Sequence, residues 1–194
     1  MINKNKNIIV LSGKKGSGKD TFADIFKRSK LIQELNDGIP FDKIIDYKVL
    51  SFAGPIKYIL SYLTKRTIED LDNNKNYELS PGKTVRDYYR LIADAFKEIF
   101  SEDIWVGQLI SSMNENDRYI ITDLRFKNEY NILLKYFNPI FIRIKRDVED
   151  DQHKSETDLD DIPDDEFDFI IDNNGDIDSL KLQINRLIEK INDI

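Results

Sequence analysis

Short apolar runs alternate with segments of helical periodicity along the chain. The runs are bounded by turn-forming or charged residues, as in strands that are buried on both faces of a sheet. They cover residues 8–11, 47–52, 118–122, 140–144 and 169–171. Apolar residues recur at helical spacing over residues 19–30, 54–63, 84–99, 102–114, 127–137 and 180–191, whereas residues 31–46 are mixed and contain turn signals. This alternation predicts an α/β fold: a five-stranded parallel sheet with helices on both of its faces.

A glycine-rich loop connects the first predicted strand to the first predicted helix. The loop and the residues after it follow the G-x-x-x-x-G-K-[ST] pattern except that Asp20 replaces Ser or Thr, and Thr21 comes one residue late. Glycines at positive φ let successive N–H groups point at one anion, and Lys19 adds a positive charge for the β- and γ-phosphates of a nucleotide. A flexible surface turn is the alternative, but it leaves the flanking strand and helix unexplained. The predicted ATP contacts here are Gly13, Lys15, Gly16, Ser17, Gly18, Lys19, Asp20 and Thr21.

The composition narrows the class of protein. With 194 residues, of which 40% are hydrophobic, the chain fits a single domain with a substantial core. It has no cysteine and one histidine, which excludes disulfides, thiolate metal sites and multi-histidine zinc sites. The net charge of −7 argues against a general nucleic-acid binder. No apolar run approaches membrane-spanning length, and the N-terminus lacks the apolar core of a secretion signal, so we expect a cytoplasmic protein that binds neither nucleic acid nor membranes.

Polar clusters follow four of the five predicted strands. They cover residues 13–19, 51–57, 122–125 and 145–146. Ligands of parallel sheets bind beyond the carboxyl ends of the strands, where such clusters meet. The sequence therefore predicts one ligand site at this edge of the sheet.

Asp123 and Arg125 are the candidates after the third predicted strand. Asp123 stands where nucleotide-binding proteins of this pattern place an acidic residue that helps to hold Mg²⁺, although an aspartate here also suits the N-cap of the next helix. Asp20 is the second candidate for the metal. Arg125 is a candidate phosphate clamp, because a guanidinium group donates two parallel N–H bonds to an oxyanion; a surface ion pair with Glu129 is the alternative.

Three further side chains have two interpretations each. Lys57 and Arg86 are either phosphate ligands or solvated charges. Trp105 can stack on a base, but its sequence context favours the interior. Arg143 alternates with isoleucines, and we expect it to face out of the sheet.

An acidic segment, residues 147–168, follows the fourth predicted strand. Such a run is by default a solvated surface, and we interpret this one as a lid over a nucleotide. Arg146, at the start of the segment, is the candidate to neutralise charge on a transferring phosphoryl group. The segment also contains the one histidine, His153, which nothing pairs with by spacing.

The order of these motifs resembles that of the phage-type deoxynucleoside monophosphate kinases, within the adenylate-kinase-like P-loop kinases. The resemblance spans nearly the whole chain, and the ordered set is more specific than any one piece. It is carried by LSGKKGSGKDT (residues 11–21), SFAGPIK (51–57), TVRDYYR (84–90), EDIWV (102–106), ITDLRFKNE (121–129), IRIKR (142–146), HKSE (153–156) and FIIDNNG (169–175).

The resemblance implies a five-stranded parallel sheet, ATP with Mg²⁺ as donor and a deoxynucleoside monophosphate as acceptor. It also implies that an aspartate at position 20 is tolerated. It assigns residues 173–175, with Asn174 among them, to the adenine edge. It assigns to the monophosphate Lys57, Arg86, Trp105, Asp123, Arg125 and Glu129. The chain departs from the family pattern at two positions: Arg90 replaces an expected glutamine, and Lys97 replaces a common arginine. These replacements affect what the resemblance implies about base selectivity and about contacts with the acceptor phosphate.

We therefore expect residues 1–194 to form one kinase domain, with a helical acceptor-binding insertion at about residues 53–116 and the lid at about 147–168. The expected catalytic residues are Lys19, Arg125 and Arg146. If the chain is phage-encoded, its place is the host cytoplasm. A kinase of another small molecule, such as dephospho-coenzyme A, and a non-enzymatic ATP-binding sensor are the alternatives. The apolar stripe of the C-terminal helix fits packing on the sheet and a homodimer contact equally well.

Overall fold

The computed structural model describes residues 5–148 and 157–193. Contacts divide the chain into two compact units, one of residues 1–50 and 113–194 and one of residues 51–112. The second unit covers most of the insertion expected at about residues 53–116. Each unit has a hydrophobic core cluster of its own.

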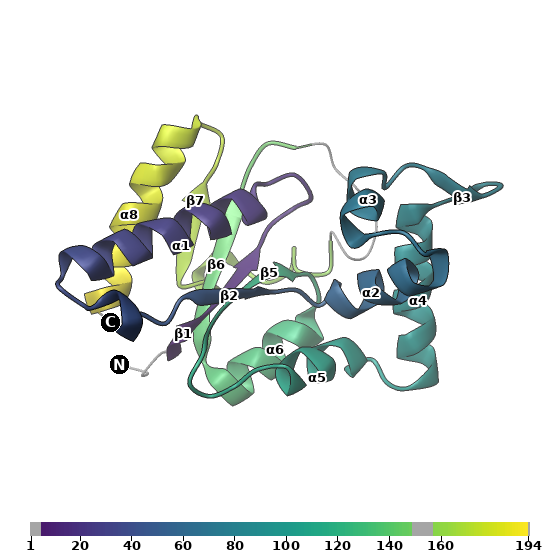
Figure 1. Cartoon of the computed structure of the whole chain (residues 1–194), viewed down its shortest axis with the longest axis horizontal. Helices are drawn as coiled ribbons and strands as arrows, with labels where there is room; N and C mark the ends of the chain where they lie inside the picture. The colour runs from purple at the N-terminus through teal and green to yellow at the C-terminus, as the bar shows by residue number, and fades with distance from the viewer. Residues whose placement is uncertain (1–4, 149–156, 194) are drawn as a thin grey trace. The chain divides into compact units, whose positions relative to one another are not determined.

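The first unit is built on a parallel sheet of five strands (Figure 1). The strand order is β2-β5-β1-β6-β7, and each neighbouring pair is parallel. The strands are β1 (Asn5–Ser12), β2 (Tyr47–Leu50), β5 (Arg118–Leu124), β6 (Pro139–Lys145) and β7 (Phe169–Asp172). The α/β class and the five-stranded parallel sheet predicted from the sequence are thus confirmed.

Helices cover both faces of this sheet. On one face lie α1 (Lys19–Asn36) and α8 (Ile177–Asp193), which pack against each other, and on the other lies α6 (Lys127–Phe137) (Figure 1). Ile9 and Leu11 of β1 belong to the core cluster under α1 and α8. On the opposite face, Phe141 of β6 contacts Tyr130 of α6, with ring centroids 4.3 Å apart. Because successive side chains of a strand point to opposite faces, only a nearly continuous apolar run fills both cores.

Helix α1 continues to Asn36, beyond the end predicted at residue 30, and a tertiary contact explains the difference. Glu34, in the last turns of α1, is buried and accepts a hydrogen bond of 2.5 Å from Arg118 Nη1 at the start of β5. The Arg118 guanidinium also lies over the Tyr47 ring, 5.6 Å from its centroid. Lys30 Nζ lies 3.9 Å from Glu34 Oε1. Burial lowers the pKa of Lys30 and raises the pKa of Tyr47 to about 12. This charged cluster links the end of α1 to the amino ends of β2 and β5.

The second unit is mainly helical. Its helices are α2 (Gly54–Thr64), α3 (Ile68–Asn73), α4 (Val85–Ile99) and α5 (Ile104–Ser111). Helices α2, α3 and α4 contribute Leu60, Leu71 and Val85, respectively, to a small core cluster. Across both described ranges of the chain, no helix combines the length and apolarity needed to cross a bilayer.

Two further short elements are described in each unit. In the second unit β3 (Glu78–Ser80) and β4 (Lys83–Thr84) form an antiparallel hairpin that the sequence pattern did not predict, because strands this short carry no periodicity. Thr84 then caps α4, since its backbone N–H donates to Asp87 at 2.8 Å and its hydroxyl accepts from the Asp87 N–H at 3.3 Å. In the first unit two 3₁₀ turns are present, η1 (Phe41–Lys43) and η2 (Asp164–Glu166).

The Glu34–Arg118 pair gives a prediction for stability. Glu34→Gln removes the carboxylate charge and leaves Arg118 facing a neutral amide. We expect the free energy of unfolding, measured by urea denaturation, to fall by about 2 kcal/mol, less than for a fully buried pair because the Arg118 side chain is 25% exposed. Glu189→Gln, at an exposed position of α8, is the control and should change it by less than about 0.5 kcal/mol. Equal effects of the two substitutions would show that the Glu34–Arg118 pair does not stabilise the fold.

Candidate functional site

The loop between β1 and α1, residues 13–18, packs too closely for side chains at two of its glycines. A Cβ on Gly13 would overlap the carbonyl oxygen of Ile144 in β6, and a Cβ on Gly18 would overlap the Asn173 side-chain amide. Gly16 and Gly18 also have φ of +80° and +94°, in the left-handed region. We call this segment the glycine loop. Its close packing on Ile144 and Asn173 requires glycine at positions 13 and 18.

Lys19 opens α1 and folds back over the glycine loop. Its side chain is nearly buried, with the residue 9% exposed. Its Nζ donates to the carbonyl oxygens of Gly13 at 2.5 Å and Lys14 at 2.9 Å, and lies 3.4 Å from Ser17 Oγ. Burial of an ammonium group is unfavourable unless oxygens surround it, and the loop supplies them. The loop thus holds one positive charge at the carboxyl end of β1, next to the N-terminus of α1.

Asn173, just beyond β7, ties the glycine loop to the far side of the sheet. Its buried side chain donates from Nδ2 to the Ser17 carbonyl oxygen at 2.8 Å, and its backbone N–H donates to the Lys145 carbonyl oxygen at 2.8 Å. The next residue, Asn174, accepts the Asp147 N–H through Oδ1 at 2.7 Å. The resemblance singled out residues 173–175 for the adenine edge, which stays a prediction. The anchoring of the loop by Asn173 was not predicted, because no sequence spacing connects residue 173 with Ser17, 156 positions away.

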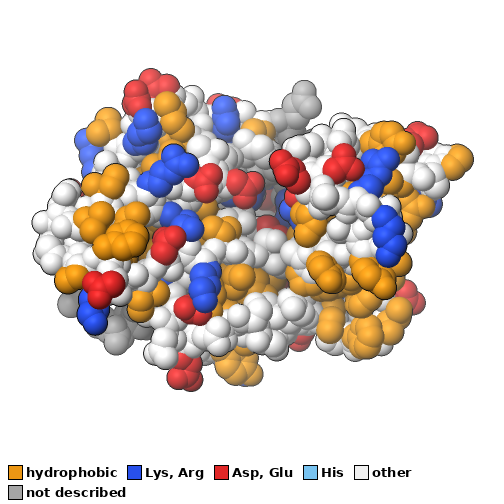
Figure 2. Space-filling view, viewed as in Figure 1, with side chains coloured by type: hydrophobic (Ala, Val, Ile, Leu, Met, Phe, Trp, Pro, Cys, Tyr) orange, Lys and Arg blue, Asp and Glu red, His pale blue; other side chains and the backbone are white. Residues whose placement is uncertain are grey.

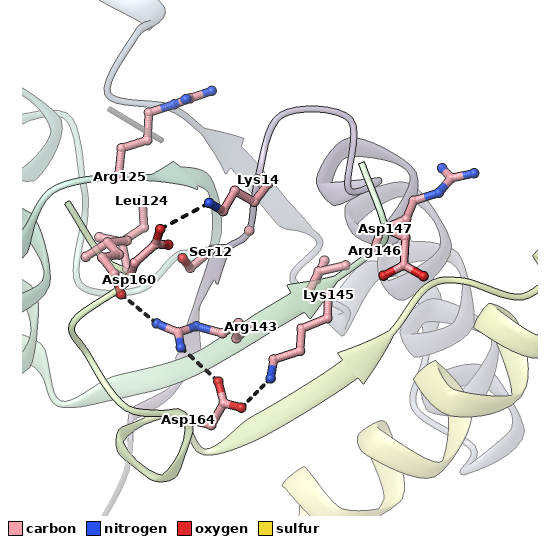
Figure 3. Close-up of a pocket in the computed structure, with 13 residues that line it drawn as sticks. Ser12, Lys14, Leu124, Arg125, Arg143, Lys145, Arg146, Asp147, Asp160 and Asp164 are labelled. Carbon is pink, nitrogen blue, oxygen red and sulfur yellow. Dashed lines mark hydrogen bonds and ion pairs between the residues drawn. The ribbon is translucent and has the colours of Figure 1, made fainter. Parts of the chain in front are cut away.

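A pocket of about 430 Å³ lies at the carboxyl ends of β1, β5 and β6 (Figure 3). Five cationic side chains belong to its lining, and three carboxylates accompany them. The charged lining residues are Lys14, Arg125, Arg143, Lys145, Arg146, Asp147, Asp160 and Asp164. On the face of the molecule seen in Figure 2, positive and negative side chains are likewise interspersed. The pocket lining carries two more positive than negative side chains.

Part of the acidic segment, residues 157–168, supplies carboxylates to the pocket cations. Lys14 is 3.1 Å from Asp160, and Arg143 Nη1 is 2.8 Å from Asp164, which also pairs with Lys145. These two cations hold the pKa of Asp164 below its usual value, Lys145 being the larger cause. Figure 3 shows these pairs in the pocket, with the guanidinium groups of Arg125 and Arg146 directed away from them on either side.

Arg143 occupies the best-defined position among these cations. Its Nη2 donates to the Leu159 carbonyl oxygen at 2.9 Å, and its guanidinium carbon lies 4.0 Å from the centre of the Phe167 ring. The side chain is 14% exposed, because residues 157–168 cover the face of β6 to which it points. Arg143 thus projects from a face of the sheet as expected, but residues 157–168 cover that face and shield the side chain from solvent. Its contacts involve residues that sequence spacing does not connect with it.

Arg125 lines the pocket at the end of β5, and Glu129 fixes the turn that carries it. The Glu129 carboxylate is buried and accepts the backbone N–H groups of Arg125 and Phe126, both at 3.0 Å, at the start of α6. Glu129 is therefore a positioning group for the Arg125 backbone in this structure. Its predicted contact with an acceptor nucleotide stays a prediction.

The candidate metal ligands lie at the same edge of the first unit. Asp20 is exposed in the first turn of α1, and Asp123 is partly exposed within β5, which extends to Leu124 rather than ending at residue 122. Within the described ranges no three or more His, Cys, Asp or Glu side chains gather as a metal site. Magnesium that arrives with a nucleotide needs only one or two carboxylates, since phosphates and water complete its shell.

Three of the predicted acceptor ligands belong to the second unit. Lys57 of α2 forms an ion pair of 2.7 Å with Asp72. Arg86 lies in the first turn of α4. Trp105 is buried against Phe96 and donates from Nε1 to the Ala93 carbonyl oxygen at 3.1 Å, as an interior residue does. Arg90 and Lys97 also lie on α4.

Two of the sequence predictions extend beyond the described residues. The motif at residues 153–156, which includes His153, lies outside them, as does part of the proposed lid at 147–168. No protein-family model matches the chain, and no curated protein is significantly similar to it. Functional inference therefore depends on the loop and the pocket.

The packing at Gly18 gives a second prediction. Gly18→Ala should lower the free energy of unfolding by about 2 kcal/mol, because alanine is unfavourable at positive φ and its Cβ meets Asn173. In the double variant Gly18→Ala/Asn173→Ala the overlap is gone, so the loss should be about 1 kcal/mol smaller than the sum of the two single losses. Urea denaturation of the four proteins measures this coupling.

Gly107→Ala is the matched control. Gly107 lies within α5 with nothing within 4 Å of a Cβ built on it, so alanine there should be neutral or stabilise by up to about 1 kcal/mol. Strict additivity at positions 18 and 173 would show that the two residues do not contact each other as described.

Proposed function

We propose that the chain is an ATP-dependent kinase that transfers the γ-phosphoryl group to a deoxynucleoside monophosphate. The observation that carries the proposal is the proximity of two anion-binding elements in one unit. Lys19 and the glycine loop lie at the end of β1, and a pocket with five cationic side chains begins at Ser12 and Gly13 of the same strand and loop. Joining two phosphate groups requires such a pair of elements, because both reactants are polyanions.

The donor is assigned to the glycine loop. N–H groups at the start of a helix have no intrahelical acceptor and favour anions, and this property fits the first turn of α1. When a triphosphate binds, Lys19 exchanges its loop carbonyl oxygens for oxygens of the β- and γ-phosphates. Asp20 and Asp123 are the carboxylates that would hold Mg²⁺ bound with ATP, and the ion would offset negative charge of the phosphates.

The acceptor phosphate is assigned to Arg125, with Arg146 neutralising charge on the transferring group. A phosphate acceptor is already ionised at neutral pH, so the reaction needs no general base, in keeping with a chain that has one histidine. Catalysis then consists of alignment and electrostatic stabilisation. The identity of the acceptor comes from the resemblance, and contacts of Lys57, Arg86 and Trp105 with it stay predictions.

Two other functions fit parts of the site. A kinase of another small molecule, such as dephospho-coenzyme A, would use the same donor loop. A non-enzymatic ATP sensor would bind ATP without acceptor-dependent turnover. The several arginines around the pocket favour a transferase, since a sensor needs a single phosphate site.

ADP release with ATP-Mg²⁺ distinguishes the three. The panel contains the four deoxynucleoside monophosphates, their ribonucleotide forms, dephospho-coenzyme A and a reaction without acceptor. Turnover that requires a deoxynucleoside monophosphate supports the proposal, and turnover only with another acceptor supports the second function. ATP binding without turnover on any acceptor would support the third function, a non-enzymatic ATP sensor.

Lys19→Met tests the donor assignment. The substitution keeps the length of the side chain and removes its charge, so kcat/KM should fall by at least about 100-fold while the fold persists. Circular dichroism and urea denaturation check the fold. Lys181→Met, on the exposed face of α8, is the control and should leave kcat/KM unchanged. Near-normal turnover of Lys19→Met would refute the donor site.

Arg125→Lys tests the acceptor assignment. Lysine keeps the charge but loses the paired N–H groups, so kcat/KM for the monophosphate should fall by about 10-fold or more while the Kd for ATP stays the same. Steady-state kinetics and titration calorimetry measure the two quantities. A parallel loss of ATP affinity would place Arg125 on the donor side instead.

A further inference from the structure

No individual role has been assigned above to Lys14, Arg143 or Lys145, yet they form the densest group of charged contacts in the pocket. They come from the glycine loop and from β6, and all three line the same cavity. Each is paired with a carboxylate from residues 157–168 (Figure 3). We propose that these cations form an oxyanion subsite whose internal occupants, Asp160 and Asp164, exchange with phosphate groups of a bound ligand.

The first argument is the way residues 157–168 are fixed. They are held by groups outside the cation cluster: the Asp158 carboxylate accepts the Lys127 backbone N–H at 2.8 Å, and the Glu166 carbonyl oxygen accepts the Tyr130 hydroxyl at 3.0 Å. Leu159 and Phe167 are buried. The segment therefore keeps its place without the ion pairs of Asp160 and Asp164.

The second argument is the exposure of the two carboxylates. The side chains of Asp160 and Asp164 are 51% and 45% exposed, in contrast to the buried anchors. Ion pairs at such exposed positions stabilise a protein only weakly. A rotation about the side-chain bonds is enough to release them to water, and no backbone contact has to break.

The third argument concerns Arg143. The Leu159 carbonyl oxygen and the Phe167 ring hold its guanidinium group independently of Asp164. When Asp164 leaves, Nη1 remains directed at the position that the carboxylate oxygen occupied. A phosphate carries more negative charge than a carboxylate and offers more acceptor oxygens, so it competes well for this position.

Binding of inorganic tripolyphosphate, followed by titration calorimetry at low ionic strength, tests the exchange. The proteins are the wild type, Asp160→Asn, Asp164→Asn, the double variant and the control Asp161→Asn. Each single variant should bind tripolyphosphate about threefold more tightly, and the double variant roughly tenfold, because an internal competitor has been removed. Asp161 lies in the same segment but pairs with Lys127, which does not line the pocket, so its variant should match the wild type.

Arg143→Gln locates the binding. It should weaken tripolyphosphate binding and abolish the gain from Asp164→Asn. Unchanged or weaker binding in both aspartate variants, binding that ignores Arg143→Gln, or no detectable binding by any protein overturns the proposal. Should Asp164→Asn unfold, Asp160→Asn still decides, since its pair with Lys14 lies at the surface.

The inference rests on the proposed function only for the source of the phosphate, a nucleotide. The two fail separately. If the protein shows no kinase turnover but the aspartate variants bind tripolyphosphate more tightly, the subsite is supported and the kinase function is refuted. If the protein has kinase turnover but the wild type and the aspartate variants bind tripolyphosphate equally well, the kinase function is supported and the carboxylate exchange is refuted.

Discussion

Convergence of positive charge at one edge of a parallel sheet is the constraint on which this structure depends. Parallel strands present all their carboxyl ends to the same side, so charged residues after β1, β5 and β6 meet around a single pocket. Like charges this close repel one another unless anions are present. The chain, with a net charge of −7, supplies those anions itself from residues 157–168.

The glycine loop is subject to a steric constraint that ties it to the same edge. The Ile144 carbonyl oxygen lies directly beneath Gly13, and Arg143 and Lys145 flank Ile144 in β6. Asn173 closes the arrangement by holding both the Ser17 and the Lys145 carbonyl groups. Loop and pocket are thus positioned by one strand, and a displacement of the loop would change the place of Lys19 relative to the pocket cations.

The sequence pattern was sufficient for the parts of the fold that follow from local periodicity. The apolar runs predicted five parallel strands, and residues 127–137 were predicted as a helix with the bounds that α6 has. The glycine spacing identified the loop after β1. The convergence of the polar residues after β1, β5 and β6 followed from the topology of parallel sheets, whereas the predicted cluster at residues 51–57 belongs to the second unit and does not line the pocket.

What the pattern did not predict depends on contacts between distant residues. Lys14 pairs with Asp160 across 146 positions, and Asn173 reaches Ser17 across 156. Period-two alternation placed Arg143 on an outward face of β6, but it contains no information on whether another segment covers that face. The extension of α1 has the same origin, because Glu34 is stabilised by Arg118, 84 positions away.

The two kinds of contact made by residues 157–168 have different consequences for the phosphate-transfer site that we propose. Catalysis by electrostatic stabilisation works best when the cations already stand in place, since reorganisation then costs little. Buried anchors such as Phe167 and the Leu159 carbonyl group keep Arg143 in place whether or not Asp164 is paired with it. Exposed ion pairs, each worth less than about 1 kcal/mol, oppose an incoming phosphate only slightly. A segment with buried carboxylates and exposed anchors would have the opposite effect. Its carboxylates would block the pocket, and once they were displaced, nothing would hold Arg143 in place.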